Sequence, residues 1–232
     1  MKISVIVPCY NEVNYIREII TRIKTRNQSL NIEIIVIDDD SDDGTKFELD
    51  KLKDEKKIDH LVLNNKNMGK GFCVREGIKL SSGEIILIQD ADLEYDPAEY
   101  EKLVMPIYND QADVVYGSRF IGSECKRVLY FWHRVANYLL TFLSNMFTNI
   151  NLTDMEVCYK AFRSDIVKKL SLEENRFGIE PEITAKIAKI KNIRIFEVGV
   201  SYFGRTYSEG KKIRLRDGIS AVRCILYYNL FR

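Results

Sequence analysis

The sequence predicts an α/β fold in which a mostly parallel central sheet is flanked by helices. Patterns typical of strands and helices alternate through the first half of its 232 residues, as in right-handed βαβ units. Several expected strands run directly into polar clusters. Apolar residues make up 46% of the chain, which is enough for a full core. We therefore expect one domain of ordinary size at residues 1–210, followed by an amphipathic C-terminal helix at 211–232.

The elements can be placed in order along the chain. In the first half we expect strands at 3–7, 32–37, 61–63, 85–88 and 113–116, and helices at 16–23, at 69–80 and from 97 onward. In the second half we expect helices at 130–147 and 181–190, a partly extended segment at 154–162, a strand at 193–202 and a helix from about 214. The longest apolar stretch, 135–152, is interrupted by asparagines. A membrane span needs about 20 apolar residues, so we interpret this stretch as a core helix and the loop after it.

Polar and mostly acidic residues follow three of the expected strands. Burying an ionised carboxylate is costly unless a cation or hydrogen-bond donors compensate, and hard divalent cations are held by such oxygens. In open α/β sheets, ligands bind beyond the carboxyl ends of the strands, so these residues predict a ligand site at one sheet edge. Solvated turns are the alternative interpretation. The residues are Pro8, Tyr10 and Glu12 after the first strand, 38–45 after the second, and Asp90, Asp92 and Glu94 after the fourth.

Five segments together resemble a known family. The first three, 7–12 (VPCYNE), 38–45 (DDDSDDGT) and 90–92 (DAD), are similar to the donor-site motifs of family 2 GT-A glycosyltransferases. The other two, 117–120 (GSRF) and 204–212 (GRTYSEGKK), resemble its dolichyl-phosphate mannosyltransferase and polyprenyl-phosphate glycosyltransferase branch. The resemblance covers nearly the whole chain in the right order. It implies a GT-A (Rossmann-like) fold and an inverting enzyme that moves mannose or glucose from a GDP- or UDP-sugar to a polyprenyl phosphate.

The same resemblance places a donor site at the strand ends. Asp92 and Glu94 are expected to bind a Mg²⁺ or Mn²⁺ ion, which as a Lewis acid stabilises the leaving diphosphate. Asp90 is expected nearer the sugar. The loop at 67–71 is a candidate to lie under the nucleotide, although Lys70 is equally well interpreted as solvated. The residues expected to bind the donor are Pro8, Tyr10, Glu12, Asp39, Asp40, Asp90 and Asp92.

Basic residues in the second half suit a phosphate acceptor, because a guanidinium matches phosphate oxygens with a fork of donors. A phosphate monoester is already ionised near neutral pH and needs no strong general base. By resemblance, Asp154 lies beside the reaction centre, and Glu182 is the favoured sugar-side acid of its segment. A solvated loop is the alternative for the basic residues. The expected acceptor-phosphate ligands are Arg119, Arg205, Lys211 and Lys212, and the catalytic candidates are Asp90, Arg119, Asp154 and Arg205.

Charge and cysteine content limit the partners. A net charge of +1 does not indicate a nucleic-acid-binding protein. Five scattered cysteines suggest neither zinc nor a disulfide framework, so a reducing cytoplasm is expected, without a signal peptide. Basic residues beside apolar stripes at 126–134 and 211–232 favour peripheral binding to the inner face of an anionic membrane. The alternative is that each stripe packs on the core. A separate membrane-anchoring subunit is a further candidate partner.

Two other functions are open at this point. A family 2 enzyme of capsular or cell-wall glycan synthesis acts on a sugar hydroxyl and needs a general base. The processive members carry a Gln-x-x-Arg-Trp motif, and the only tryptophan, Trp132, is not in one. A non-catalytic nucleotide-sugar-binding protein is the second alternative, although Asp92, Arg119 and Arg205 are all present.

Overall fold

The computed structural model describes residues 1–122, 124–128, 130–206, 209–210, 212 and 215–232, and it has the expected α/β fold. Its strands are β1 (Lys2–Cys9), β2 (Asn31–Asp38), β3 (His60–Leu63), β4 (Ile85–Ile88), β5 (Val114–Ser118), β6 (Lys160–Arg163) and β7 (Ile195–Gly199). Its helices are α1 (Ile16–Arg26), α2 (Thr45–Asp54), α3 (Lys70–Leu80), the 3-10 helix η1 (Pro97–Glu99), α4 (Tyr100–Tyr108), α5 (Phe131–Thr148), α6 (Ser164–Val167), α7 (Ile179–Ala188) and α8 (Leu215–Leu230).

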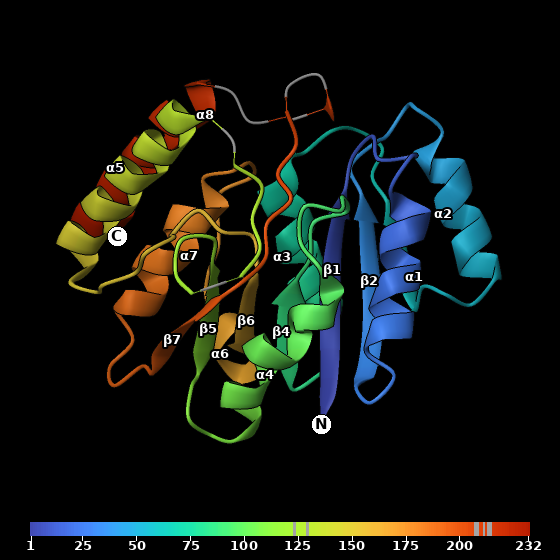
Figure 1. Cartoon of the computed structure of the whole chain (residues 1–232), viewed down its shortest axis with the longest axis horizontal. Helices are drawn as coiled ribbons and strands as arrows, with labels where there is room; N and C mark the ends of the chain where they lie inside the picture. Colours follow the sequence, from blue (N-terminus) through green and yellow to red (C-terminus); the bar gives the residue numbers. More distant parts are fainter. Residues whose placement is uncertain (123, 129, 207–208, 211, 213–214) are drawn as a thin grey trace.

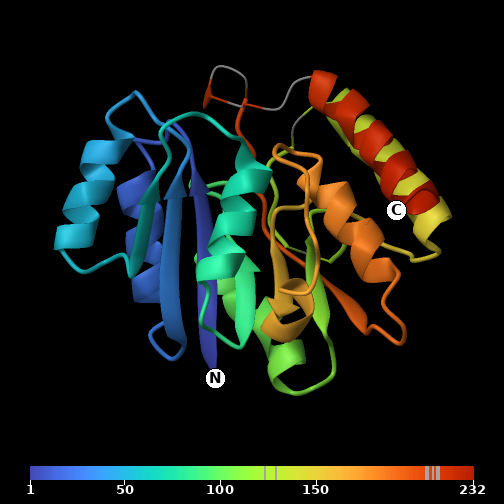
Figure 2. The same cartoon turned by 180° about the vertical axis from the view of Figure 1, so that it is seen from behind.

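A seven-stranded sheet in the order β3-β2-β1-β4-β6-β5-β7 forms the centre of the molecule. The β1–β2, β1–β4, β2–β3 and β5–β7 pairs are parallel, whereas β6 runs antiparallel between β4 and β5. Helices α1 and α4 cover the face nearer the viewer in Figure 1, and α3 and α7 cover the face seen in Figure 2. Because both faces are covered, the central strands are continuous apolar runs, and every residue of β4 is buried.

The direction of the strands brings distant loops to one edge. The carboxyl ends of β1, β2, β4 and β5 lie at the upper edge in Figure 1. Strand β6 starts at this edge because it runs the other way, with Lys160 opposite Tyr116 and Ala161 opposite Leu87. The loop that precedes β6 therefore lies beside the polar segments that follow the parallel strands.

Most of the predicted elements are found within a few residues of their expected bounds. The fourth strand is placed as predicted at 85–88, and the helix expected from 181 begins at Ile179. The partly extended segment at 154–162 forms a strand only from Lys160 onward. The mostly parallel sheet is confirmed.

The prediction that 135–152 begins with a core helix is met on one side of α5 only. The fully buried residues of α5 are Thr141 and Ser144, and Leu140, Leu143 and Phe147 on the same helix are partly buried against the core. The Thr141 hydroxyl accepts a hydrogen bond from the Met155 amide, and the Asn145 side chain bonds Leu152 through both of its polar atoms. Apolar side chains on the other side are exposed, namely Phe131, Trp132, Tyr138, Leu139, Phe142 and Met146.

Helix α8 packs against α5 and α7 at one end of the sheet (Figures 1 and 2). Its buried side carries Ala221, Cys224, Ile225 and Tyr228. The predicted apolar stripe of this helix is divided, because Ile225 is buried whereas Ile219 and Val222 are exposed. Among the described residues, no helix is long and apolar enough to cross a membrane.

Candidate active site

Three carboxylates at the ends of β1 and β4 surround the guanidinium of Arg205. Nη1 and Nη2 of Arg205 each donate to Glu12 at 3.0 Å, and Nη2 also donates to Asp92 at 2.6 Å. The Arg205 backbone amide donates to Glu94 at 2.7 Å. Lys212 supplies a second cation, with its Nζ 2.6 Å from Glu12. The first and fourth strands thus bring their acids together as predicted, and the segment that follows β7 closes over them.

Acids outnumber cations in this cluster. Burial, with repulsion from Glu94 and Asp90, raises the pKa of Asp92 to about 8, although Arg205 acts in the opposite direction. Oxygens of Asp92 and Glu94 already converge on one cation, so this donor set fits a hard divalent ion such as Mg²⁺ or Mn²⁺. In the described part of the chain, no three acidic, histidine or cysteine side chains form a ready metal site. A metal here requires the guanidinium of Arg205 to move away.

Asp90 belongs to a second network, which sequence reasoning did not identify. Lys70 lies between two acids, with its Nζ 2.9 Å from Asp90 and 3.3 Å from Glu180. The buried Lys160 ammonium bonds the other oxygen of Glu180. Burial opposes ionisation of Asp90, but the Lys70 ammonium lowers the pKa of that carboxyl below its usual range. Lys70 is therefore an ion-paired residue of the site rather than a solvated side chain.

A close approach of two loops holds Lys70 in place. Gly69 has a φ of +99°, and a Cβ added at Gly71 would lie 2.3 Å from the Glu174 carbonyl oxygen. The loop at 67–71 can therefore pack directly on residues 174–176 only because these positions are glycines. The Phe72 amide donates to the Asn175 carbonyl at 3.1 Å, which fixes the start of α3 against the same segment.

The choice of Glu182 as the sugar-side acid is wrong. The carboxylate of Glu182 is fully buried and accepts hydrogen bonds from the Glu173 and Glu174 amides at 2.7 and 2.8 Å. It therefore anchors the loop before α7. Glu180, two residues earlier and facing Lys70, is the acid of this segment that reaches the site.

The predicted nucleotide-side residues have different surroundings. The Asp39 carboxylate accepts hydrogen bonds from the Met68 and Gly69 amides at 2.8 and 2.7 Å, so it holds the loop that leads to Lys70. Asp40 is partly exposed and pairs with Lys46 at 2.6 Å. Tyr10 and Pro8 are at least partly exposed at the end of β1, and the Lys212 ammonium lies 5.6 Å from the centre of the Tyr10 ring.

Arg119 and Asp154 form a buried ion pair at the end of β5. Nε and Nη2 of Arg119 donate to the two oxygens of Asp154 at 2.6 and 2.7 Å, and the Arg119 amide adds a third bond at 3.1 Å. The Asn137 side chain on α5 bonds both partners at 3.2 Å. The guanidinium carbons of Arg119 and Arg134 each lie 5.6 Å from the centre of the Phe120 ring.

The four expected acceptor-phosphate ligands are not gathered in one place. Arg119 pairs with Asp154, whereas Arg205 and Lys212 contact the donor-side acids. Lys211 lies outside the described residues, as does Arg214. Arg134, which shares the Phe120 ring with Arg119, was not among the predicted ligands, although the basic and aromatic character of 126–134 pointed to this segment.

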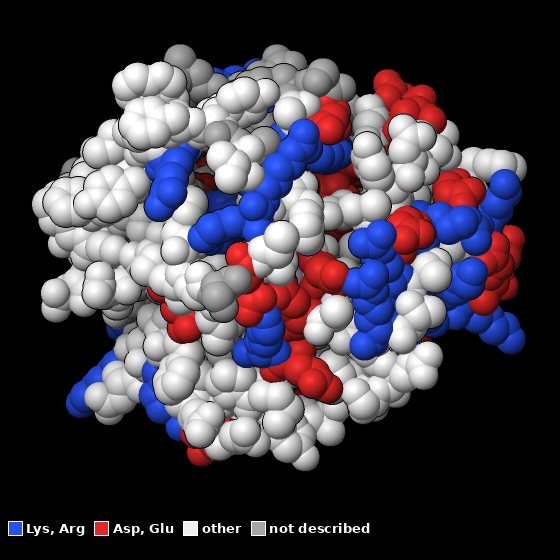
Figure 3. Space-filling view, viewed as in Figure 1, with Lys and Arg blue, Asp and Glu red and all other residues white. Residues whose placement is uncertain are grey.

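The outer surface of α5 is poor in charge. Figure 3 shows an almost uncharged region over α5 at the left, while basic side chains gather around a recess above the carboxyl edge of the sheet. On α8, Arg223 pairs with Glu174 at 2.5 Å, and Arg216 is exposed. The exposed residues of the apolar surface include Phe131, Trp132, Leu139, Phe142 and Met146 on α5, and Ile219, Val222 and Leu230 on α8.

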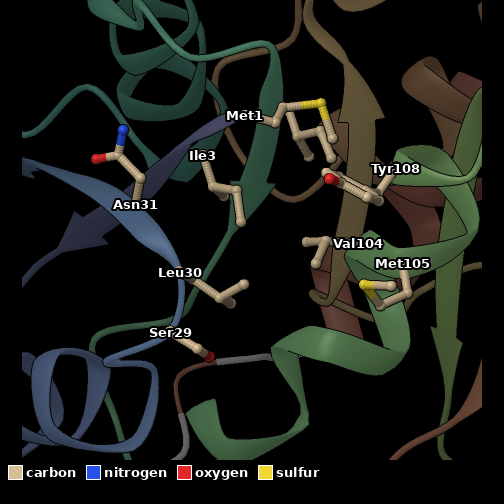
Figure 4. A pocket seen from close by; sticks show the side chains of 9 residues that line it. Met1, Ile3, Ser29, Leu30, Asn31, Val104, Met105 and Tyr108 are labelled. Atoms are coloured by element: carbon tan, nitrogen blue, oxygen red, sulfur yellow. The ribbon is translucent and has the colours of Figure 1, made fainter.

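A separate small cavity lies far from these groups, at the amino edge of the sheet. It is lined by residues at the starts of β1 and β2 and by α4, including Met1, Asn31 and Tyr108 (Figure 4). Its walls are mostly apolar and it contains no acid from the strand ends. We therefore place the chemistry at the opposite, carboxyl edge.

Comparison with known proteins identifies a family and several relatives of this chain. The family model described as glycosyl transferase family 2 matches residues 4–171. Dolichol-phosphate mannosyltransferase of Pyrococcus furiosus is 30% identical over 216 residues, which cover 92% of this chain. This chain spans only 61% of that relative's length. Undecaprenyl-phosphate mannosyltransferase of Micrococcus luteus is 26% identical over 221 residues, which cover 91% of this chain and 87% of the relative.

Solved structures share the fold. Glucosyl-3-phosphoglycerate synthase of Mycobacterium tuberculosis, in complex with Mn²⁺, uridine diphosphate and phosphoglyceric acid, aligns with a TM-score of 0.75 at 17% identity. The alignment covers 100% of this chain and 79% of that one. The same synthase with Mg²⁺ and uridine diphosphate aligns with a TM-score of 0.72 at 18% identity, over 98% and 79% of the two chains.

Proposed function

The chain belongs to glycosyl transferase family 2, and from this membership we propose that it moves a hexose from a GDP- or UDP-sugar to a polyprenyl phosphate at a membrane surface. Two of its relatives are named as mannosyltransferases that act on dolichol phosphate and undecaprenyl phosphate. The proposed reaction inverts the anomeric centre, because the acceptor oxygen attacks from the side opposite to the leaving diphosphate.

The acids at the strand ends support the donor half of this proposal. Asp92 and Glu94 are the residues that would hold Mg²⁺ or Mn²⁺, which neutralises charge on the leaving diphosphate when bound. Asp90, held by Lys70, is placed to orient the sugar beyond the diphosphate. Glu12 and Tyr10 at the end of β1 flank the side on which the nucleoside would lie.

The burial of Asp154 and its pairing with Arg119 are the observation that favours a phosphate acceptor. A hydroxyl acceptor needs a general base, and Asp154 is the acid at the acceptor end of the site. Both of its oxygens are engaged by Arg119, and its side chain is fully buried, so it is poorly placed to remove a proton. An ionised phosphate oxygen needs no such base. Arg119 and Arg134, which share the Phe120 ring, supply guanidinium groups that suit a phosphate monoester.

Arg205 is proposed to act after the donor has bound. It occupies the position between Asp92 and Glu94 that a metal ion would take, and both cations cannot lie there together. Donor and metal binding would therefore release its guanidinium toward the acceptor side. This order of events favours binding of the nucleotide sugar before the lipid phosphate.

The surface of α5 supports access from a membrane. Its exposed apolar side chains suit the interfacial region of a bilayer, and Arg134 on the same helix lies beside the proposed phosphate site. A lipid could thus keep its chain in the bilayer while its phosphate reaches Arg119. This arrangement would place the protein as a peripheral enzyme on the cytoplasmic face of an anionic membrane.

The test is transfer of labelled hexose from GDP-mannose and from UDP-glucose, with Mn²⁺, to a short polyprenyl phosphate in detergent. The matched control acceptor is the polyprenol of the same length, which carries a hydroxyl in place of the phosphate. We expect product from one donor with the phosphate and none with the alcohol. Equal transfer to the alcohol, or transfer only to a sugar hydroxyl, would instead favour an enzyme of glycan synthesis.

A further inference from the structure

The loop between α5 and β6 carries an acid whose role is not explained by the groups described so far. This loop lies at the carboxyl edge because β6 runs antiparallel to its neighbours. At its start, Asp154 pairs with Arg119. Toward its end, the Cys158 thiol lies beside Asp90 and 3.9 Å from the Ile88 carbonyl oxygen. Glu156 comes between them in sequence, and its carboxylate is close enough to Arg119, Asp154 and Glu180 for their charges to act on it.

One oxygen of Glu156 has no bonding partner. Its Oε1 is buried and accepts no hydrogen bond from any residue that the structure describes. A buried acceptor left in this state is costly, and such atoms in folded proteins call for an explanation. Although Oε1 is buried, the residue as a whole is partly exposed.

The charged groups around Glu156 do not supply a hydrogen-bond donor to its free oxygen. The charges of Lys160 and Arg119 lower the pKa of Glu156, whereas those of Glu180 and Asp154 raise it. Burial is the main reason that the pKa of Glu156 rises to about 7, with repulsion from Glu180 second. The neighbouring cations are already committed, since Lys160 bonds Glu180 and Arg119 bonds Asp154.

We propose that Glu156 determines sugar specificity, by accepting a hydrogen bond from one hydroxyl group of the donor hexose. This inference rests on the proposed function, because it assumes a nucleotide-bound sugar beyond Asp90. A sugar that carries the matching hydroxyl satisfies the buried oxygen, whereas a sugar without it leaves that oxygen unpaired. Sites of this kind reject the analogue that lacks the hydroxyl far more strongly than an apolar pocket can.

The experiment measures donor binding without an acceptor, by titrating GDP-mannose, UDP-glucose and their single-deoxy analogues into the protein with Mn²⁺. In the wild type, one deoxy analogue should bind about tenfold to a hundredfold more weakly than its parent sugar. In Glu156→Ala, the parent should weaken to the level of that analogue, while the penalties for the other deoxy positions stay unchanged. Glu156→Gln keeps an acceptor oxygen and should retain most of the discrimination.

Two controls separate this role from a structural one. Glu84→Ala removes an exposed acid at the opposite edge of the sheet. It should leave the ratio of affinities between each parent sugar and its deoxy analogues as in the wild type. Removing an unpaired buried acid should leave the thermal midpoint of Glu156→Ala unchanged or higher, whereas loss of a structural contact would lower it. If Glu156→Ala weakened all sugars equally, or kept the wild-type pattern of penalties, Glu156 would not contact the sugar.

Failure of this inference is distinct from failure of the proposed function. Transfer to polyprenyl phosphate that proceeds while the deoxy penalties are unaffected by Glu156→Ala would overturn only the role of Glu156. Donor discrimination that depends on Glu156 in a protein that transfers only to hydroxyl groups would overturn the acceptor and keep the sugar contact. Binding of nucleoside diphosphates with no contribution from any sugar would overturn the role of Glu156 directly.

Discussion

At the scale of single residues, Arg205 is the cation that the carboxylates of Glu12 and Asp92 hold, in the place that we propose for a metal ion. Its guanidinium contacts Glu12 and Asp92, and its backbone amide holds Glu94. A side chain that is only 14% exposed and paired with several acids has little freedom to leave unless another cation replaces it. The same residue is thus a competitor of the metal and, once displaced, a candidate ligand of the acceptor phosphate.

Arg205→Ala should therefore have opposite effects on metal binding and on transfer. Mn²⁺ should bind more tightly in the absence of nucleotide, because Asp92 and Glu94 lose their internal partner. Transfer to polyprenyl phosphate should fall about tenfold to a hundredfold, the effect of losing one charged hydrogen bond. Isothermal titration with Mn²⁺ and a transfer assay measure the two quantities. Arg22→Ala, which breaks a surface pair with Glu18 on α1, is the matched control. Weaker Mn²⁺ binding in Arg205→Ala would contradict the competition.

The raised pKa of Asp92 predicts a pH dependence whose sign can be worked out. With a folded-state pKa of about 8 against an ordinary value of 3.8, Asp92 holds its proton more tightly in the folded protein than in the unfolded chain. Its contribution to stability is therefore full below pH 4 and is lost as the pH rises toward 8. A cation needs the ionised carboxylate, so Mn²⁺ binding should strengthen over the same range.

Thermal unfolding of the wild type and Asp92→Asn from pH 5 to 8, with and without Mn²⁺, tests this expectation. The midpoint of the wild type should fall relative to that of Asp92→Asn as the pH rises, and Mn²⁺ should restore it in the wild type alone. Asp92→Asn should also lose nearly all transfer. A constant difference between the two proteins across this range would show that Asp92 is ionised throughout.

The sequence predicted part of this site and not the rest, for a physical reason. Glu12, Asp92 and Glu94 follow apolar runs directly, and parallel pairing brings strand ends to one edge whatever the details of packing. Lys70 and Glu180 meet only because the loop at 67–71 packs on residues 174–176, over a hundred positions away in sequence. No local pattern records such a contact.

At the scale of elements, α5 has polar residues and part of its apolar residues inward, and the larger part of its apolar residues outward. Asn137, Thr141 and Asn145 bond the loop before β6, which is why polar side chains share the inward side of this helix with apolar ones. The sequence pattern located the helix within one residue at each end but not its orientation, because an apolar stripe marks only the side that avoids water. Whether a core or a membrane covers this side depends on contacts that the pattern does not contain.

Substitution on the outer side of α5 tests membrane binding better than truncation does. Removal of residues 211–232 would uncover the α7 surface that Cys224 and Tyr228 cover, so loss of binding could simply reflect unfolding. Leu139→Ser and Phe142→Ser change side chains that are 57% and 56% exposed. Phe47→Ser on α2, at the far end of the sheet and 66% exposed, is the matched control.

We expect the wild type and Phe47→Ser to sediment with anionic vesicles, and the double α5 variant to stay in solution. High salt should weaken but not abolish binding, because screening affects only the electrostatic part and Lys212 and Arg223 are already paired within the protein. Equal loss of binding in Phe47→Ser, or undiminished binding of the α5 variant, would show that another surface meets the lipid.

At the scale of the whole molecule, the alternation of strands and helices predicted the α/β class and most of the sheet. The parallel pairing of β1, β2, β3 and β4 follows from their helical crossovers. The placement of β6 did not follow, because Lys160–Arg163 is too short and too polar at its ends to specify its neighbours. Its antiparallel pairing depends on long-range contacts with β4 and β5.

The position of β6 has a consequence for how the chain reaches its native state. The strands β1, β2, β3 and β4 lie within the first 88 residues and pair with one another, so this half of the sheet can form early during synthesis. Strand β5 pairs only with β6 and β7 and must wait for both, while β4 presents an open edge that could join another chain. In refolding followed by pulsed hydrogen exchange, amides of β1 and β2 should become protected before those of β5. Simultaneous protection would show that the two halves form as one unit.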